Sequence, residues 1–177
     1  MDNIRLEKNI CDNIYEAQLK LGYDKRPVSL NYTAASLEHI LGEVPTEDIL
    51  KEFALTVQER LGQLQFRLIK NGWCITVPAE GCEYVHNNSG ERSFMKKLVD
   101  AVRDHADAAE LLGLFRKASP DAVIKDLSNE EFRYLVYFPG GVPDEYYYCI
   151  AEEEEMDGSL HASYHRFIRE DYEDFGF

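Results

Sequence analysis

Histidine side chains are the residues of this sequence best suited to bind a metal. His161 and His165 lie four positions apart, so they would share one side of a helix but stand about 13 Å apart on a strand. Asp157-Gly158, just before them, favours a hairpin turn and therefore a strand, on which the pair cannot ligate one ion. We expect no metal site and no cofactor, because the other histidines have no ligand-like neighbours in the sequence: His39, His86 and His105.

Motifs for nucleophilic or phosphate chemistry are absent from the sequence. It contains no GxSxG, P-loop or GxGxxG pattern, so neither an exposed serine nucleophile nor a glycine-rich phosphate loop is indicated. With 33 Asp and Glu residues, carboxylate pairs arise by chance and do not by themselves predict acid–base catalysis. We expect a non-catalytic protein, and the open alternative is an active site that assembles only in three dimensions.

Aromatic and acidic residues suggest a binding surface near the C-terminus. Three consecutive tyrosines must point to both faces of a strand, so at least one ring lies outside the core unless both faces are covered. The four glutamates that follow either form a solvated strand end that discourages edge pairing or dock a basic partner. The candidate protein-binding surface is therefore made of Tyr146, Tyr147, Tyr148, Glu152 and Glu153.

The net charge of −14 limits the classes of partner. Residues 1–87 hold 9 basic and 13 acidic residues, whereas residues 88–177 hold 10 basic and 20 acidic residues. A polyanion repels nucleic acid unless a local basic patch overcomes the field. The charge therefore disfavours nucleic acid, and it either aids solubility alone or attracts a basic protein.

Cysteine usage and the first residues bear on the compartment. The four cysteines have neither CxxC nor zinc spacing, and we interpret them as reduced, mostly buried thiols of a cytoplasmic protein. The N-terminal stretch lacks a signal-peptide core, and no apolar run approaches the roughly 18 residues of a membrane span. The cysteines are Cys11, Cys74, Cys82 and Cys149.

A hairpin predicted from Gln63 to Pro78 organises the N-terminal half. Asn71-Gly72 favours a two-residue type I′ turn, which requires positive φ angles. The flanking runs then place apolar side chains on one face and polar ones on the other. This register contains the pairs Lys70 with Trp73, Leu68 with Ile75, and Phe66 with Val77.

The elements before the hairpin give the N-terminal half a recognisable order. Apolar spacing predicts a helix over 4–22, a strand over 28–32, and helices capped by Thr33 and by Thr46. This order of helix, strand, helix, helix and hairpin resembles the winged helix-turn-helix fold over residues 1 to about 86. The resemblance implies a DNA-reading third helix, yet Thr46–Gly62 holds two basic and four acidic residues. The hairpin would have to supply the contacts, from Arg67, Lys70 and Trp73.

Asn87-Asn88-Ser89-Gly90 is turn-rich, and we place a domain boundary there, between units 1–87 and 88–177. The second unit is predicted to contain helices over 91–104 and 107–117, the latter with an Asp107/Glu110 capping box. Strands follow over 132–138, 146–151 and 160–167, then a helical turn over 169–175. Residues Val123–Leu127 fit either a helical turn or a strand. The fold class is α+β, with an antiparallel sheet of three to four strands, and the two units either fold separately or share one core. The alternative to an exposed tyrosine face is that the two helices cover one face of the sheet and the terminal segment covers the other.

Several stretches resemble a family of uncharacterised bacterial proteins of about this length, described as a domain of unknown function. They are EGCEYVHNN, EFRYLVYF, DEYYYCI and SYHRFIREDYEDF. The resemblance implies no activity and no site residues.

We expect a cytoplasmic, non-catalytic protein–protein interaction module. One specific form is an acidic inhibitor, of the immunity or antitoxin kind, that blocks a basic nuclease-like partner. The alternative is a winged-helix transcription regulator that binds DNA through its hairpin. A second alternative is an enzyme of unrecognised type.

Overall fold

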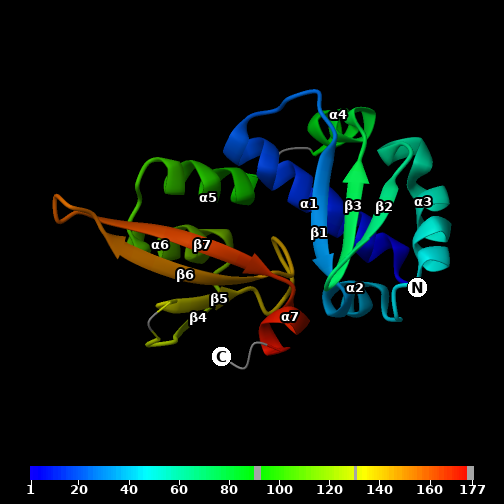
Figure 1. The fold of residues 1–177 in the computed structure, drawn as a ribbon. Coiled ribbons are helices and arrows are strands. Elements are labelled where there is room, and N and C mark those ends of the chain that lie inside the picture. The colour runs from blue at the N-terminus through cyan, green and yellow to red at the C-terminus, as the bar shows by residue number, and fades with distance from the viewer. Residues whose placement is uncertain (90–92, 130, 175–177) are drawn as a thin grey trace. The chain divides into compact units, whose positions relative to one another are not determined.

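The computed structural model describes residues 1–89, 93–129 and 131–174, which form an α+β fold with two antiparallel sheets (Figure 1). Its helices are α1 (Asn3–Leu21), α2 (Ala34–Leu41), α3 (Glu47–Leu61), α4 (Ala79–Asn88), α5 (Ser93–Arg103), α6 (Ala108–Ala118) and α7 (Arg169–Asp174). Its strands are β1 (Val28–Thr33), β2 (Gln65–Ile69), β3 (Gly72–Val77), β4 (Val123–Asp126), β5 (Tyr134–Tyr137), β6 (Tyr147–Glu154) and β7 (Leu160–Phe167). The α+β class predicted from the sequence is confirmed.

The chain divides into two compact units, Met1–Glu91 and Arg92–Phe177. In the first unit, β3 lies between β1 and β2 in an antiparallel sheet. The buried residues of helices α1, α2 and α3 recur every three or four positions, so each helix turns one apolar side toward the core of this unit. The largest fully buried side chains of this unit include Leu6, Ile10, Ile14, Leu37, Leu50, Phe53 and Ile75.

Side-chain caps begin the helices where the sequence predicted them. The Thr33 hydroxyl accepts a hydrogen bond from the Ser36 amide at 3.0 Å, and Thr46 caps α3 in the same way. In α6 the predicted capping box between Asp107 and Glu110 is present in both directions. These caps satisfy backbone N–H groups that have no partner within the helix, so the helix starts are determined locally.

The predicted type I′ turn at Asn71-Gly72 is wrong by one residue. The turn is Lys70-Asn71, and the register pairs Phe66 with Ile75 and Leu68 with Trp73. Neither turn residue nor Gly72 has a positive φ angle, so the turn is not of the primed type. The shift moves every predicted pair by two residues and leaves each side chain on its expected face.

Gly72 is required for a close approach of strands rather than for turn conformation. A Cβ atom there would lie 2.0 Å from the Tyr32 carbonyl oxygen and 2.8 Å from the Ala34 nitrogen. This closeness lets the Asn71 carbonyl accept a hydrogen bond from Ala34 N–H at 3.0 Å. The end of β1, the start of α2 and the β2–β3 turn are therefore held together at a position that only glycine can occupy.

Helix α4 follows the hairpin, in a stretch for which the sequence predicted no helix. Pro78 precedes its first residue, where a missing N–H is tolerated. Asn87 and Asn88 complete the last turn of α4, which corrects the predicted break at that place. The Asn88 side chain donates to the Tyr84 carbonyl at 2.8 Å. Asparagine, which is common in turns, here provides a hydrogen-bond donor to a carbonyl group in the last turn of the helix. Of the predicted elements, residues 90–92 and 175 lie outside the described part of the chain.

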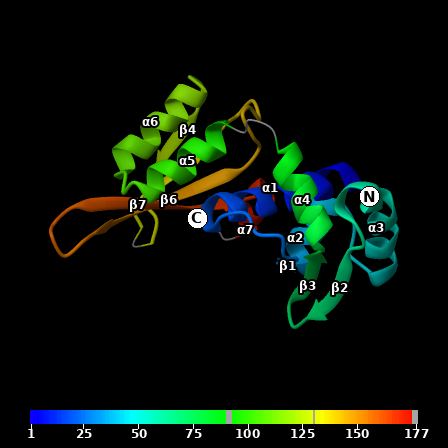
Figure 2. The same cartoon turned by 90° about the horizontal axis from the view of Figure 1, so that it is seen from above.

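The second unit is a four-stranded antiparallel sheet in the order β4-β5-β6-β7. Val123–Asp126 is a strand at its edge, which decides the question that the sequence left open. Helices α5 and α6 lie side by side on one face (Figure 2). On the other face, Tyr172 of α7 packs with Phe132, Leu135 and Cys149. Both faces of the sheet are thus covered, which explains why its central strands are apolar on both sides.

We predict that replacing Gly72 destabilises the first unit much more than an equivalent change elsewhere. Gly72→Ala should lower the free energy of unfolding by about 3 kcal/mol, because backbone atoms must move apart. In α6, a Cβ on Gly113 meets nothing within 4 Å, so Gly113→Ala should raise it by about 0.5–1 kcal/mol. Urea denaturation measures both. Equal effects of the two variants would contradict this explanation of Gly72.

A second prediction concerns Cys149, which is fully buried. Burial, with a smaller contribution from Glu131, raises the pKa of its thiol to about 11. Above about pH 9 the unfolded chain loses this proton and the folded chain keeps it, so the free energy of unfolding should fall as pH rises toward about 11. In Cys149→Ala this decline should be shallower, as measured by denaturation between these pH values. An identical slope in both proteins would exclude the effect.

Candidate functional site

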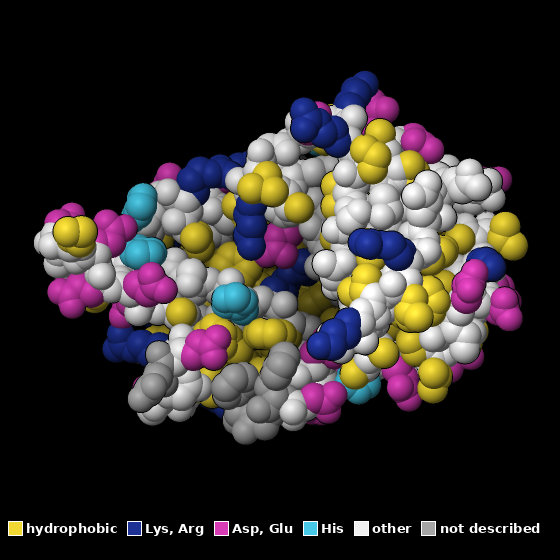
Figure 3. Space-filling model, in the orientation of Figure 1, with side chains coloured by type: hydrophobic (Ala, Val, Ile, Leu, Met, Phe, Trp, Pro, Cys, Tyr) yellow, Lys and Arg dark blue, Asp and Glu magenta, His cyan; other side chains and the backbone are white. Residues whose placement is uncertain are grey.

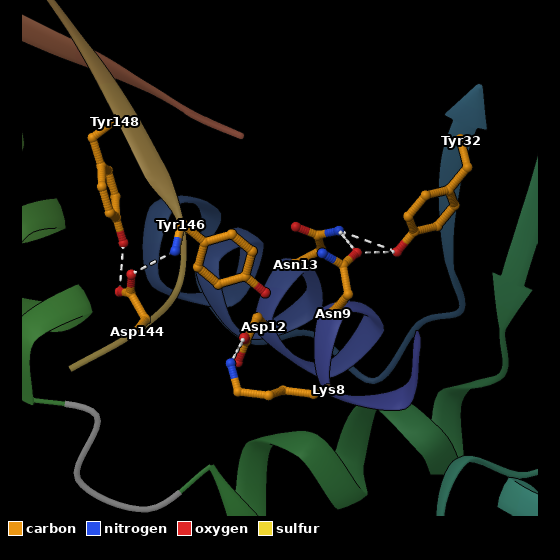
Figure 4. A network of polar contacts seen from close by, with 8 residues as sticks. All are labelled: Lys8, Asn9, Asp12, Asn13, Tyr32, Asp144, Tyr146 and Tyr148. Atoms are coloured by element: carbon orange, nitrogen blue, oxygen red, sulfur yellow. Dashed lines mark hydrogen bonds and ion pairs between the residues drawn. The ribbon is translucent and has the colours of Figure 1, made fainter. Parts of the chain in front are cut away.

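Tyr146 and Tyr148 belong to the interior and not to a binding surface. Tyr148 is 1% exposed, and its hydroxyl donates to the Asp144 carboxylate at 2.7 Å (Figure 4). The other oxygen of Asp144 accepts from the Tyr146 backbone N–H at 3.0 Å. The Arg166 guanidinium lies 4.2 Å from the centre of the Tyr146 ring. Burial, followed by the Asp144 charge, raises the pKa of Tyr148 well above its usual value, so this hydroxyl stays protonated and anchors the start of β6.

Tyr147 points to the opposite face, as an alternating strand requires. Its ring stacks on Tyr137 at 4.5 Å and lies 5.4 Å from Tyr172. Burial raises the pKa of Tyr147. The tyrosine run is therefore covered by α5 and α6 on one side and by α7 on the other, the arrangement that the sequence offered as the alternative to a tyrosine surface.

Glu152 fixes the start of α6. Its carboxylate accepts from the Ala108 N–H at 2.9 Å, and its other oxygen pairs with Arg133. The side chain is 9% exposed. An acid at a helix N-terminus is stabilised by the free N–H groups and the helix dipole. Glu152 was predicted as a docking residue, and this position gives it a structural role instead.

The residues that follow Glu152 form an acidic tip on the β6–β7 hairpin. Glu153 is 73% exposed and Met156 is completely exposed. Gly158 turns the chain with a φ of +82°, and hydrogen bonds from Ser159 lower the pKa of Asp157. We call residues 153–160 the acidic hairpin. Acidic side chains gather at this tip of the second unit (Figure 3), so it is the part of the predicted surface that remains available to a partner.

Two histidines meet one glutamate beside the acidic hairpin. Glu155 lies 3.3 Å from Nδ1 of His105 and 3.4 Å from Nδ1 of His161. The α5–α6 turn brings His105 to this place because it docks on β7, where Ala162 N–H donates to the Ala106 carbonyl at 2.7 Å. In the described residues, no group of three or more His, Cys, Asp or Glu side chains is arranged to hold a metal ion.

The residues proposed for nucleic acid do not form one patch. Arg67 is exposed on the outer face of β2, and Lys70 is exposed in the turn. Trp73 pairs with Leu68 and points to the opposite face from Arg67, where it is half-buried. In α3, both basic residues form ion pairs with glutamates, Lys51 with Glu47 at 2.6 Å and Arg60 with Glu7.

A buried polar network ties α1 to β1 in the first unit. The Tyr32 hydroxyl donates to the Asn9 side-chain oxygen at 2.9 Å, and the Asn13 amide contacts both groups (Figure 4). No nucleophile or metal ligand belongs to this trio. The two amide side chains and the phenol satisfy one another's hydrogen-bonding groups inside the protein, so we assign the network a structural role.

Comparisons with known proteins identify a family and no activity. A model described as a domain of unknown function from an E. rectale gene description (DUF3877) matches residues 3–176. The resemblance to a bacterial family of unknown function is therefore confirmed. No curated protein and no solved structure matches the chain, so the winged-helix resemblance stays a prediction. No helix in residues 1–89, 93–129 or 131–174 is long and apolar enough to cross a membrane.

The different environments of Glu152 and Glu153 yield a prediction. Glu152→Gln should lower the free energy of unfolding by about 1–2 kcal/mol, because it weakens the hydrogen bond to α6 and the Arg133 pair. Glu153→Gln, one residue away and exposed, is the matched control and should change it by less than about 0.5 kcal/mol. Thermal or urea denaturation distinguishes them. Indistinguishable variants would mean that Glu152 does not hold α6.

Proposed function

Because the chain belongs to the DUF3877 family, a domain of unknown function, we propose a function from its own geometry. It is a non-catalytic, cytoplasmic protein-interaction module that binds a basic protein through the acidic hairpin. The observation that carries this proposal is the separation of Glu152, held inside, from the exposed acids that follow it.

The shape of the acidic hairpin supports a docking role. The β6–β7 pairing continues to Glu154 and Leu160, so the tip is held by strand hydrogen bonds on both sides. The exposed Met156 adds an adaptable apolar side chain among the charges. Anchoring one apolar residue within a charged rim is a common composition for a protein interface.

The charge of the chain supports a basic partner. The net charge is −14, and 20 of the 33 acids lie in residues 88–177. Such a field accelerates the encounter with a basic protein and slows the encounter with nucleic acid. An inhibitor of a basic nuclease-like protein is the specific form that we favour. Three of the four cysteines are buried, which is consistent with a reducing cytoplasm.

A DNA-binding regulator is the second candidate, and one observation favours it. The strands β1, β2 and β3 contain no acidic residue, and Arg67 and Lys70 are exposed at this sheet. Duplex DNA would then bind with an affinity that falls steeply with salt. Absence of binding at low salt removes this candidate.

The proposed interaction predicts a charge-dependent capture. The tagged full chain should retain basic proteins from a lysate of its source cells at low salt, and capture should fall as ionic strength rises. Glu153→Lys combined with Glu154→Lys should reduce capture about tenfold or more.

The control changes net charge by the same amount at two other exposed acids, Glu38→Lys with Asp121→Lys. It should retain most of the capture. If both double variants lose capture equally, the acidic hairpin is not the site. If nuclease treatment of the lysate abolishes capture, the regulator replaces the interaction module.

A further inference from the structure

A groove runs between α3 and the edge of the three-stranded sheet in the first unit. Its volume is about 480 Å³. Helix α3 lines one wall with Ala54, Leu55, Gln58 and the ion pair of Glu47 with Lys51, and the other wall includes Leu64 and Phe66. Leu55 is 74% exposed. Hydrophobic side chains gather over this part of the surface (Figure 3). The groove is in the first unit, so it is a different site from the acidic hairpin.

Strand β2 leaves backbone groups open along this groove. In the described sheet it pairs with β3 only. The two-residue loop makes Ile69 and Gly72 a hydrogen-bonded pair. The backbone N–H and C=O groups of Arg67, two residues before Ile69, therefore also bond to β3. Alternation then turns the N–H and C=O groups of Phe66 and Leu68 toward the open edge. An unpaired edge of this kind is a template for another strand.

This edge has little of the usual protection against pairing, since Arg67 is the one charged residue of β2. Strand β2 contains no proline, and its sequence is QFRLI. Leu68 is 70% exposed. At the β7 edge of the other sheet, by contrast, the α5–α6 turn supplies the Ala106 carbonyl to Ala162 N–H. The edge of β7 is thus covered, whereas the largely apolar edge of β2 is open beside a groove. An open edge of this kind is a site for β-strand addition.

The length of the groove sets the length of the occupant. Its wall on α3 runs from Glu47 to Gln58, which spans about 16 Å at 1.5 Å per residue. An extended chain covers that distance with about five residues. Alternate side chains of such a segment would enter the groove against Leu55 and Phe66, so they must be apolar.

The remaining side chains of the segment would lie on the outer face of the sheet, beside Arg67. Arg67 and Lys70 are the nearby exposed charges of the hairpin, and the three strands carry no carboxylate. Opposite charges on neighbouring strands stabilise a pair and like charges destabilise it. The outer side chains are therefore acidic. A second copy of β2 would bring another Arg67 to this edge and is disfavoured.

We propose that the groove between α3 and the open edge of β2 binds an extended segment of a partner protein in which apolar side chains alternate with acidic ones. The segment adds a fourth strand to the sheet through the backbone of Phe66 and Leu68. This inference goes beyond the proposed function, because the acidic hairpin selects a basic surface and the groove selects an acidic extended peptide.

Selection from a displayed library of random heptapeptides tests the proposal. The full chain is the bait, and Leu55→Arg, which fills the groove from an exposed helix position, is the counter-bait. Enriched peptides should alternate apolar with acidic residues. The best peptide, measured by fluorescence anisotropy, should bind Leu55→Arg about tenfold or more weakly and bind the control Leu21→Arg within about twofold of the original chain.

Two further measurements separate strand addition from simple apolar binding. Two N-methylated forms of the peptide are compared, one methylated at the odd and one at the even backbone nitrogens. Only one of the two forms should lose binding, since only one set of N–H groups faces β2. Arg67→Glu should change the selected outer residues from acidic to basic. The proposal is overturned if no peptide prefers the original chain to Leu55→Arg, if both N-methylated forms bind equally, or if sedimentation shows a dimer that Leu55→Arg dissociates.

Discussion

Backbone hydrogen bonding at sheet edges is the constraint on which both units depend. Each strand must give its N–H and C=O groups a partner on both sides or expose them to water. In the second unit the α5–α6 turn supplies that partner to β7 through the contact between Ala106 and Ala162. The same contact positions α6, whose N-terminus is held by Glu152. In the first unit the edge of β2 stays open, and a groove lies beside it.

The distribution of charge follows from this architecture. Inside the second unit, Glu152 is tolerated because a helix N-terminus and Arg133 compensate its charge. The acids after it project from the sheet at a hairpin tip. In the first unit the three strands carry no acid, whereas α3 carries four. A chain of net charge −14 thus presents one strongly acidic tip and one sheet edge with local basic charge, and these can attract different partners.

Local signals predicted much of the fold. Helix starts followed from Thr33, Thr46 and the Asp107/Glu110 box, because a cap needs only neighbouring residues. The role of Gly72 was misassigned, since its close neighbour Tyr32 is 40 positions away. Asn-Gly is a turn signal in isolation, and the tertiary contact overrode it.

The candidate site was predictable only in part, for the same reason. Period-two alternation could have separated Glu152 from Glu153, because Glu152 shares its face with the buried Tyr148 and Ile150. The meeting of His105 with His161 depends on how a helix turn docks on β7, and no local pattern carries that information. The groove beside β2 could not be predicted from a local pattern either, because its two walls come from α3 and from the edge of the sheet.

The central proposal is that this protein acts by binding, through defined surfaces and without chemistry of its own. Amide hydrogen exchange, measured on the free protein and on the protein with its captured partners, tests it most directly. We predict slower exchange in the acidic hairpin with a basic partner, and slower exchange at Phe66 and Leu68 with an extended acidic one. Protection confined to other parts of the chain, with both surfaces unchanged, would contradict the account.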